Sequence, residues 1–324
     1  MERRLLLAAL GLAALASCAS RGAGRTALGG GPWRSTRQAG HPLAGAIWSA
    51  AERRLVDGQV LEGALRSARY CLLGEVHDNP DHHRIQLDLL RSMAEAGRKP
   101  RVAFEQFDRE HDGALQEYMV SGRTTAEGVA DEVRFDRKGW NWDFYRPLVE
   151  LALRHGLPLR AANLSSSAAA RIVREGLQSI GAERLVALRL ESVWSPEREQ
   201  ALRAVVLESH CAMLPERLLP GMAAAQRVRD ATLAQALLDS GPDGAVLIAG
   251  NGHVRRDLGV PLYVTAARGA ICSVGILEAE EGKEEPRDYY VDGRELPSQF
   301  DFVCFTPGWE RPDPCASFKP RSHS

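Results

Sequence analysis

The stretch Tyr70-Cys71-Leu72-Leu73-Gly74-Glu75-Val76-His77 joins a short apolar run to a glycine and, three residues later, to a histidine. A second apolar run, residues 245–249, leads into Gly250-Asn251-Gly252-His253 and repeats the pattern. A glycine at the end of a buried strand lets the backbone turn without a Cβ clash. Ligands of open α/β sheets bind beyond the carboxyl ends of the strands. The repeated pattern therefore predicts that His77 and His253 share one polar site.

Predicted strands and helices alternate over most of the chain. Strand-like apolar runs cover residues 70–76, 101–107, 157–163, 244–251, 261–265 and 269–278. Helical patterns cover residues 80–96, 108–120, the stretch from Trp140 to His155, a stretch from Ser165, and most of 194–240 with breaks at Pro215 and Pro220. Asn79 and Pro80 fit the N-cap and the first position of their helix. This alternation predicts an α/β fold, a parallel or mixed sheet flanked by helices, with a helix-rich lid or subdomain at about 165–240.

The composition is that of an ordinary globular protein, with 324 residues, 44% hydrophobic and 26% charged. The net charge of −1 gives no bulk attraction to nucleic acid, and no nucleic-acid partner is expected.

The N-terminus has the pattern of a bacterial lipoprotein signal peptide. Arg3 and Arg4 precede an apolar run, residues 5–15, which is too short to span a bilayer. Leu15-Ala16-Ser17-Cys18 resembles a lipobox, so we predict a signal peptide over 1–17, lipidation of Cys18 and a flexible tether over 18–40. Ala19 after the lipidated cysteine favours the outer membrane. The predicted location is the bacterial cell envelope, and the predicted membrane contact is a lipid anchor.

The remaining cysteines divide into two groups. Cys71 and Cys272 lie in strand-like apolar runs, where a thiol behaves as a small buried hydrophobic group. Cys304 and Cys315 lie near the C-terminus of an exported protein, so a disulfide between them is expected as one option. Residues 280–324 are rich in charge and proline and predict an irregular tail after a main domain over 41–279.

Polar residues at the strand ends are the first candidates for chemistry. Glu75 and His77 end one predicted strand, Glu105 lies near the end of the next, and His253 follows a later one. His77, Glu105 and His253 could bind a divalent metal ion, and with Glu75 they could serve as acid–base groups in a hydrolase.

Helical residues supply a second set of candidates. His82 and Gln86 lie on the apolar face of the helix from Pro80, and His83 borders that face. Gln226 and Arg229 interrupt the apolar face of a later helix. Such groups either form a buried network with Asp230 or line a cavity and offer charge to an anionic ligand. His210 precedes this helix and could cover the site.

Several familiar motifs are absent from the sequence. There is no Gly-x-Ser-x-Gly nucleophile elbow, no phosphate-binding loop of the Gly-x-x-x-x-Gly-Lys type, and no Cys-x-x-Cys-His for covalent haem attachment.

Several motifs in order resemble the ChaN-like haem-binding lipoproteins, a family within the wider superfamily of Tiki-type proteases, TraB-like proteins and erythromycin esterases. The resemblance starts at Leu73-Gly74-Glu75-Val76-His77-Asp78-Asn79-Pro80-Asp81-His82-His83 with Gln86 and covers roughly residues 45–315. The motifs that continue it are Ala103-Phe104-Glu105-Gln106-Phe107, Trp140-Asn141-Trp142 with Tyr145, Ala161-Ala162-Asn163, His210, Gln226 with Arg229, Gly250-Asn251-Gly252-His253 and Asp313-Pro314-Cys315.

The resemblance implies a membrane-anchored lipoprotein that binds haem in iron acquisition, as a homodimer that clasps haem at the subunit interface and works with haem-uptake machinery. The residues assigned to haem on this basis are His82, His83, Gln86, His210, Gln226 and Arg229. The axial ligand stays open between histidine and tyrosine, which both ligate haem iron in proteins. The alternative function is a metal-dependent peptidase or esterase that uses His77, Glu105 and His253.

Overall fold

An eight-stranded mixed sheet forms the centre of the computed structural model, which describes residues 31–122, 124–264, 270–291, 294–295, 299–313 and 315–316. The strand order is β2-β1-β10-β7-β3-β6-β4-β5. The strands from β10 to β5 are parallel, whereas β1 pairs antiparallel with β10 and with β2. The strands are β1 (Ile47–Ser49), β2 (Arg54–Val56), β3 (Tyr70–Leu73), β4 (Arg101–Asp108), β5 (Leu159–Asn163), β6 (Ala245–Ile248), β7 (Ile271–Glu278) and β10 (Phe302–Thr306), with a separate ribbon of β8 (Tyr290–Val291) and β9 (Arg294–Glu295).

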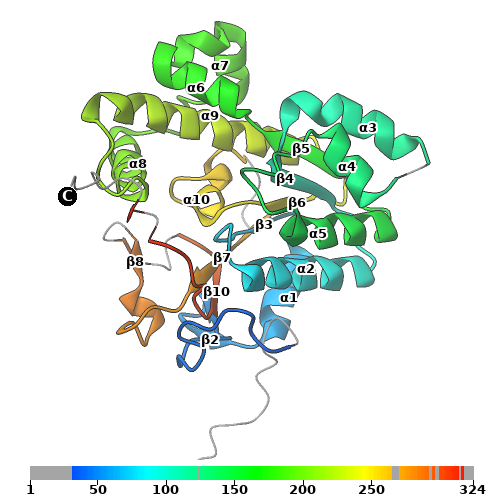
Figure 1. Ribbon diagram of the computed structural model, residues 1–324, viewed down its shortest axis with the longest axis vertical. Helices are drawn as coiled ribbons and strands as arrows, with labels where there is room; N and C mark the ends of the chain where they lie inside the picture. Colours follow the sequence, from blue (N-terminus) through cyan, green and yellow to red (C-terminus); the bar gives the residue numbers. More distant parts are fainter. Residues whose placement is uncertain are drawn as a thin grey trace, which may run out of the picture.

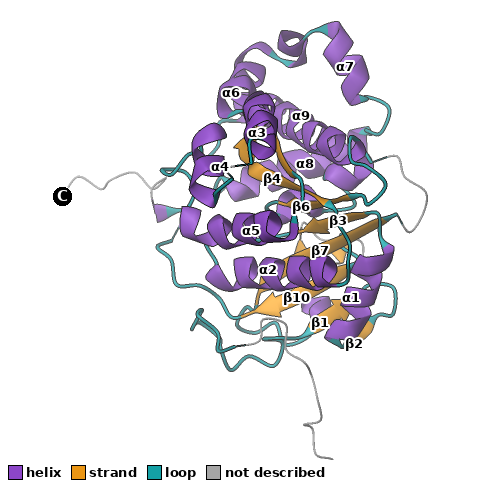
Figure 2. Ribbon diagram, turned by 90° about the vertical axis from the view of Figure 1, so that its right-hand side faces the viewer, coloured by secondary structure: helices purple, strands orange, loops and turns teal. Residues whose placement is uncertain are grey.

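Helices cover both faces of this sheet (Figure 1). They are α1 (Gly58–Ser67), α2 (Pro80–Glu95), α3 (Asp112–Val120), α4 (Ala126–Glu132), α5 (Trp142–His155), α6 (Ser166–Glu175), α7 (Ala182–Leu188), α8 (Pro196–Ser209), α9 (Leu219–Leu238) and α10 (Asn251–Val254). Alternate side chains of β3 point to opposite faces of the sheet. Cys71 and Leu73 pack with α1, α2 and α5, whereas Tyr70 and Leu72 pack with α6 and α9. In Figure 2, α2 and α5 lie side by side over the sheet.

The predicted α/β class with a mixed sheet and flanking helices is confirmed. The helix-rich stretch is also present: α6 to α9 gather at the end of the molecule opposite β2 (Figure 1), and α8 packs on α9 through Leu202, Val206 and Ala223.

Local signals placed the starts of α2 and α6 correctly, whereas the helix expected from residue 108 begins as a 3-10 turn, Arg109–His111, and continues as α3 from Asp112. Asn79 caps α2 by accepting a hydrogen bond from the Asp81 backbone N–H at 2.9 Å, and Pro80 takes the first helical position. Asn141 and Ser165 cap α5 and α6 in the same way. Pro220 does not break its helix, because it lies in the first turn of α9, where its missing N–H costs no hydrogen bond.

Four features of the structure differ from the sequence prediction. Residues 260–262 form a 3-10 turn in place of the strand expected over 261–265. Phe302–Thr306, expected in the irregular tail, forms the buried strand β10 between β1 and β7. The short strands β1 and β2 were not predicted. Residues 31–40, expected within the tether, are bound to the domain: the Arg34 and Ser35 backbone N–H groups donate to the Asp81 carboxylate, and Arg37 pairs with Gly308.

Candidate functional site

Glu75 and His77 form a hydrogen-bonded pair at the carboxyl end of β3. His77 Nδ1 lies 2.8 Å from Glu75 Oε1, which also accepts hydrogen bonds from the Tyr145 hydroxyl at 2.7 Å and from Gln106 at 3.1 Å. Burial alone would raise the pKa of Glu75, but His83, His77 and the Tyr145 hydroxyl outweigh it and lower that pKa. Glu75 is therefore a fixed anion that holds the His77 ring by its Nδ1–H.

His77 is the exposed member of this pair. Its side chain is 43% exposed, whereas that of Glu75 is fully buried. Burial lowers the pKa of His77, but the neighbouring Glu75 and Glu105 carboxylates raise it above its usual value. A Cβ on Gly250 would lie 2.8 Å from Nε2 of the His77 ring, so the close approach of the two Gly-x-x-His turns requires glycine there.

His253 is held between two carboxylates. Its Nδ1 lies 2.5 Å from Asp230 on α9, and its Nε2 lies 3.2 Å from Glu105 on β4. Burial lowers the pKa of His253, but Glu105 and Asp230 outweigh it and raise the pKa to about 10. Glu105 is fixed as an anion by His253 and by the Gly250 backbone N–H, which donates at 2.7 Å. His253 is therefore an imidazolium at neutral pH.

This arrangement does not support the metal site predicted from His77, Glu105 and His253. A metal-binding histidine needs a lone pair on one ring nitrogen, and both nitrogens of His253 donate to carboxylates. Within the part of the chain that the structure describes, no group of three or more His, Cys, Asp or Glu residues could hold a metal ion.

His82, His83 and Gln86 support the turn after β3 and do not line the cavities described below. His82 accepts from the Val76 backbone N–H at 2.8 Å and donates to Thr306 at 2.9 Å. Burial and the nearby His83 lower its pKa well below the usual value, so it is neutral. His83 donates to the His77 carbonyl at 2.9 Å, and Gln86 donates to the carbonyls of Leu73 and Gly74. The polar contacts of these three residues go to the backbone, to Thr306 and to Glu75, so their predicted contact with the cofactor stays a prediction.

A cavity of about 540 Å³ opens above the two Gly-x-x-His turns, and we call it the central cavity. Glu75, His77 and His253 line its floor, and α8 and α9 form its roof. The apolar lining consists of Val76, Leu202, Val205, Val206, Met222 and Leu258. The predicted convergence of both histidines on one site is thus present, with Glu105 directly beneath His253.

The α8–α9 region adds three polar groups to the central cavity. Gln226 and Arg229 on α9 line it, and the Gln226 amide lies 3.2 Å from His253. The two interpretations of the polar face of α9 were a buried network with Asp230 and the lining of a cavity. Both apply, because Gln226 contacts the His253–Asp230 pair and Arg229 lines the cavity. Arg229 Nε is buried and has no hydrogen-bond partner. His210, at the end of α8, lines the roof and donates from Nδ1 to the Val206 carbonyl at 2.7 Å.

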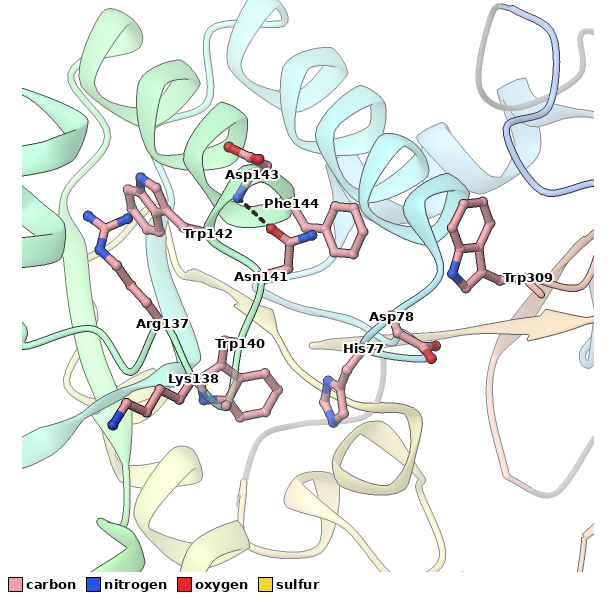
Figure 3. A pocket seen from close by; sticks show the side chains of 11 residues that line it. His77, Asp78, Arg137, Lys138, Trp140, Asn141, Trp142, Asp143, Phe144 and Trp309 are labelled. Carbon is pink, nitrogen blue, oxygen red and sulfur yellow. Dashed lines mark hydrogen bonds between the residues drawn. The ribbon is translucent and has the colours of Figure 1, made fainter. Parts of the chain in front are cut away.

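A second, more open cavity of about 680 Å³ adjoins His77 on its other side (Figure 3). We call it the aromatic cavity, because Trp140, Trp142, Phe144 and Trp309 line it together with Arg137 and Lys138. His77 meets Trp140 edge to face, with ring centroids 4.7 Å apart. The sequence interpretation noted the Trp140-Asn141-Trp142 motif but did not predict Trp309, which approaches only through tertiary contacts of the C-terminal segment.

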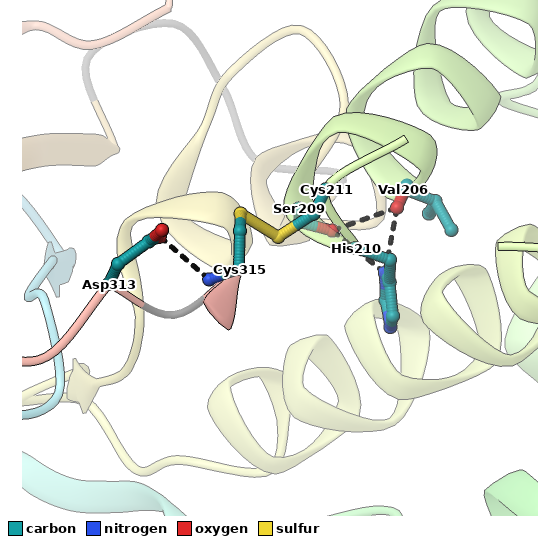
Figure 4. The surroundings of a disulfide bond; sticks show 6 residues. All are labelled: Val206, Ser209, His210, Cys211, Asp313 and Cys315. Carbon is teal, nitrogen blue, oxygen red and sulfur yellow. Dashed lines mark hydrogen bonds between the residues drawn. A yellow bond between two sulfur atoms is a disulfide. The ribbon is translucent and has the colours of Figure 1, made fainter. Parts of the chain in front are cut away.

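A disulfide joins Cys211, next to His210, to Cys315 near the C-terminus (Figure 4). The expected pairing of Cys304 with Cys315 is wrong, because Cys304 is a buried free thiol within β10. Cys71 and Cys272 are also buried and free, as predicted. The sequence could not reveal this pairing, since the two bonded cysteines lie 104 residues apart.

Comparison with solved structures finds one that shares this fold and others that match more weakly. A solved structure described as "Cofacial heme binding to ChaN of Campylobacter jejuni" matches with a TM-score of 0.64 and 20% identity, covering 80% of this chain and 95% of that chain. A mutant erythromycin esterase, EreC, in its open conformation gives a TM-score of 0.46 at 11% identity over 81% of this chain and 97% of the other. No curated protein matches the sequence. Residues 61–264, more than half of the chain, match the family of haem-binding uptake proteins named ChaN within the Tiki superfamily, and the chain belongs to that family.

Proposed function

We propose that this protein binds haem in its central cavity, with His210 as the axial ligand of the iron. The observation that carries the proposal is the hydrogen bond from His210 Nδ1 to the Val206 carbonyl. A carbonyl oxygen can only accept, so Nδ1 donates its proton to it, and Nε2 is the ring nitrogen that is left to ligate the iron. Histidines that ligate metals characteristically donate their other ring N–H in this way. Among the residues that the structure describes, no tyrosine lines the central or the aromatic cavity.

The rest of the central cavity fits an iron porphyrin. Its volume lies in the range of cofactor sites, and its roof is mainly aliphatic, as the flat apolar macrocycle requires. Haem also carries two propionates, which need a cationic partner. Arg229 meets this need, because it lines the cavity and no carboxylate lies within ion-pair distance of it among the described residues. Bound haem would supply iron for storage or transfer, while the protein holds and orients it.

A haem titration followed in the Soret region tests the assignment. The wild-type protein should give a saturable Soret shift, and His210→Ala should weaken haem binding at least tenfold and change the band position. His155→Ala, at the end of α5 and outside the cavity, is the matched control and should bind as the wild type does. An unchanged spectrum and affinity in His210→Ala would contradict the ligand assignment. A wild-type protein without any Soret shift would contradict haem binding itself.

We also infer a role in iron acquisition at the bacterial cell envelope, with a lipid anchor at Cys18, a homodimer as the haem-binding form, and haem-uptake machinery as its partner. The lipobox-like sequence supports the anchor, and membership of a haem-uptake family supports the rest. Cys18 lies outside the described residues. In the described part of the chain, no helix is long and apolar enough to cross a membrane.

A second candidate, hydrolysis without a metal, rests on the Glu75–His77 pair. An anionic carboxylate on Nδ1 orients the ring so that Nε2 can serve as a general base, as in a catalytic triad. Hydrolysis of a chromogenic ester that is lost in His77→Gln, but retained in His210→Ala, would favour this function. Turnover that is the same in both variants and in the wild type would exclude it.

A further inference from the structure

A third cavity, of about 350 Å³, lies at the carboxyl ends of β4 and β5 and shares no lining residue with the central cavity. Three arginines from three different segments line it: Arg109 follows β4, Arg171 lies on α6, and Arg184 lies on α7. We call it the arginine cavity. Ser179 and Ile180, in the turn between α6 and α7, also line it; Figure 1 shows these two helices at the end of the molecule opposite β2.

The positive charge in the arginine cavity is poorly compensated. Among the described residues, Arg171 and Arg184 have no carboxylate within ion-pair distance, and Arg109 has Asp239 at 3.8 Å. One terminal nitrogen of Arg109 is buried without any hydrogen-bond partner. Burial and the nearby Arg109 lower the pKa of Arg184, so the two guanidinium groups repel each other. An anion between them would satisfy the unpaired N–H groups and remove this repulsion.

The start of α6 adds hydrogen-bond donors to the same cavity. Ser165 caps this ten-residue helix and, with Ala168 of its first turn, lines the cavity, so the positive end of the helix borders it. Ser165 also donates to Glu110, which is the one carboxylate among the described residues that line the cavity. Three guanidinium groups against the carboxylates of Glu110 and Asp239 leave a net positive charge for an anion, and the fork of arginine fits phosphate oxygens.

Two hydrogen-bond acceptors in the cavity indicate that the rest of the ligand carries hydrogen-bond donors. Asn163 at the end of β5 is only 8% exposed, and its side-chain oxygen is buried without a donor. Glu110 offers further acceptor oxygens beside it. A simple anion has no hydrogen to give these oxygens, whereas the hydroxyl groups of a polyol do.

We propose that the arginine cavity binds a small, soluble phosphate monoester that carries hydroxyl groups, of the glycerol phosphate or sugar phosphate type. The arginines and the α6 N-terminus hold the phosphate, and Asn163 accepts a hydrogen bond from a hydroxyl of the ester. This site is independent of haem binding, because the two cavities share no residue.

Calorimetric titration of the full-length protein with glycerol 3-phosphate tests this proposal. We expect saturable binding, at least tenfold weaker in Arg184→Gln and in Arg109→Gln. Arg174→Gln is the matched control, because Arg174 lies on α6 but does not line the cavity, and its affinity should equal that of the wild type. Soret titration of each variant shows whether it is folded. If Arg184→Gln is misfolded, Arg171→Gln replaces it with the same expectation.

Inorganic phosphate and lipid vesicles provide the remaining comparisons. Inorganic phosphate should bind more weakly than the ester, and Asn163→Leu should abolish the difference between the two. Absence of ester binding by the wild-type protein, or equal affinity in Arg184→Gln, would overturn the proposal. Equal affinity for phosphate and ester would overturn the assignment of a hydroxylated ester. Sedimentation with phosphatidylglycerol vesicles that depends on Arg184 would assign the site to a lipid headgroup instead.

Discussion

At the scale of single residues, the two matched histidines have opposite roles. Both Gly-x-x-His turns were predictable from the sequence, and so was their meeting at one edge of the sheet. The chemical roles of the two histidines were not predictable, because the protonation of each ring depends on partners that are distant in the sequence. Asp230 on α9 locks His253 as a cation, and Glu75, held by Tyr145, leaves one nitrogen of His77 free. A short motif specifies where a side chain emerges, while its protonation is set by tertiary contacts.

The protonated His253 predicts a specific loss of stability at alkaline pH. Its pKa rises from about 6.5 in the unfolded chain to about 10 in the fold, so the folded state binds the extra proton. The resulting stabilisation is complete below pH about 6.5 and is lost as the pH rises through about 10. We therefore expect the free energy of unfolding, measured in urea, to fall between pH 7 and pH 10.5.

The variant His253→Gln isolates this contribution. It leaves two buried carboxylates without their cation, which should lower the free energy of unfolding by about 3–5 kcal/mol at pH 7. Its loss of stability between pH 7 and pH 10.5 should be clearly smaller than that of the wild type. His155→Gln should retain the full alkaline loss. If the free energy of unfolding falls equally with pH in the wild type and in His253→Gln, another group causes the alkaline loss of stability.

At the scale of elements, the predictable parts are those with local signals. The starts of α2, α5 and α6 carry capping side chains, and β3 and β6 are continuous apolar runs between turn residues. The strand β10 has an apolar run as well, but its neighbours in sequence are charged or proline-rich, and its strand partners are β7 and β1. Pairing between distant segments decides such a strand, and a single sequence does not display that pairing.

The Cys211–Cys315 disulfide connects two elements and should contribute strongly to stability. It closes a loop of 104 residues and so restricts the unfolded chain, which typically stabilises a fold by about 2–4 kcal/mol. The double variant Cys211→Ser with Cys315→Ser should lose stability of that order in urea unfolding. Because Cys211 follows His210, the double variant should also bind haem more weakly than the wild type. Dithiothreitol should bring the wild type to the level of the variant and leave the variant unchanged. A wild type that is equally stable with and without the reductant would contradict this role.

At the scale of the whole molecule, the start of the ordered domain lies near the candidate site. Arg37 pairs with Gly308, whose neighbour Trp309 lines the aromatic cavity, and the Ser35 backbone binds Asp81 at the start of α2. The first described residues therefore lie on the side of the molecule that carries His77. By chain length alone, the sequence between Cys18 and residue 31 can separate the proposed anchor from the domain by at most about 45 Å. A lipid at Cys18 would keep the aromatic cavity close to the membrane surface.

The anchor itself gives the final prediction. With Cys18 acylated, the protein should remain with the membrane fraction, because several acyl chains on one residue bind a bilayer far more firmly than one. Cys18→Ser removes the acceptor thiol and should move the protein to the soluble fraction. The haem affinity of the released protein should not change, since the central cavity contains no residue before Glu75. Ser17→Ala, which keeps a small residue before the cysteine, is the control and should stay membrane-bound. Mass spectrometry of the wild type should show acyl chains on Cys18. Equal division of Cys18→Ser and wild type between the fractions, with no acylation found, would contradict the lipid anchor.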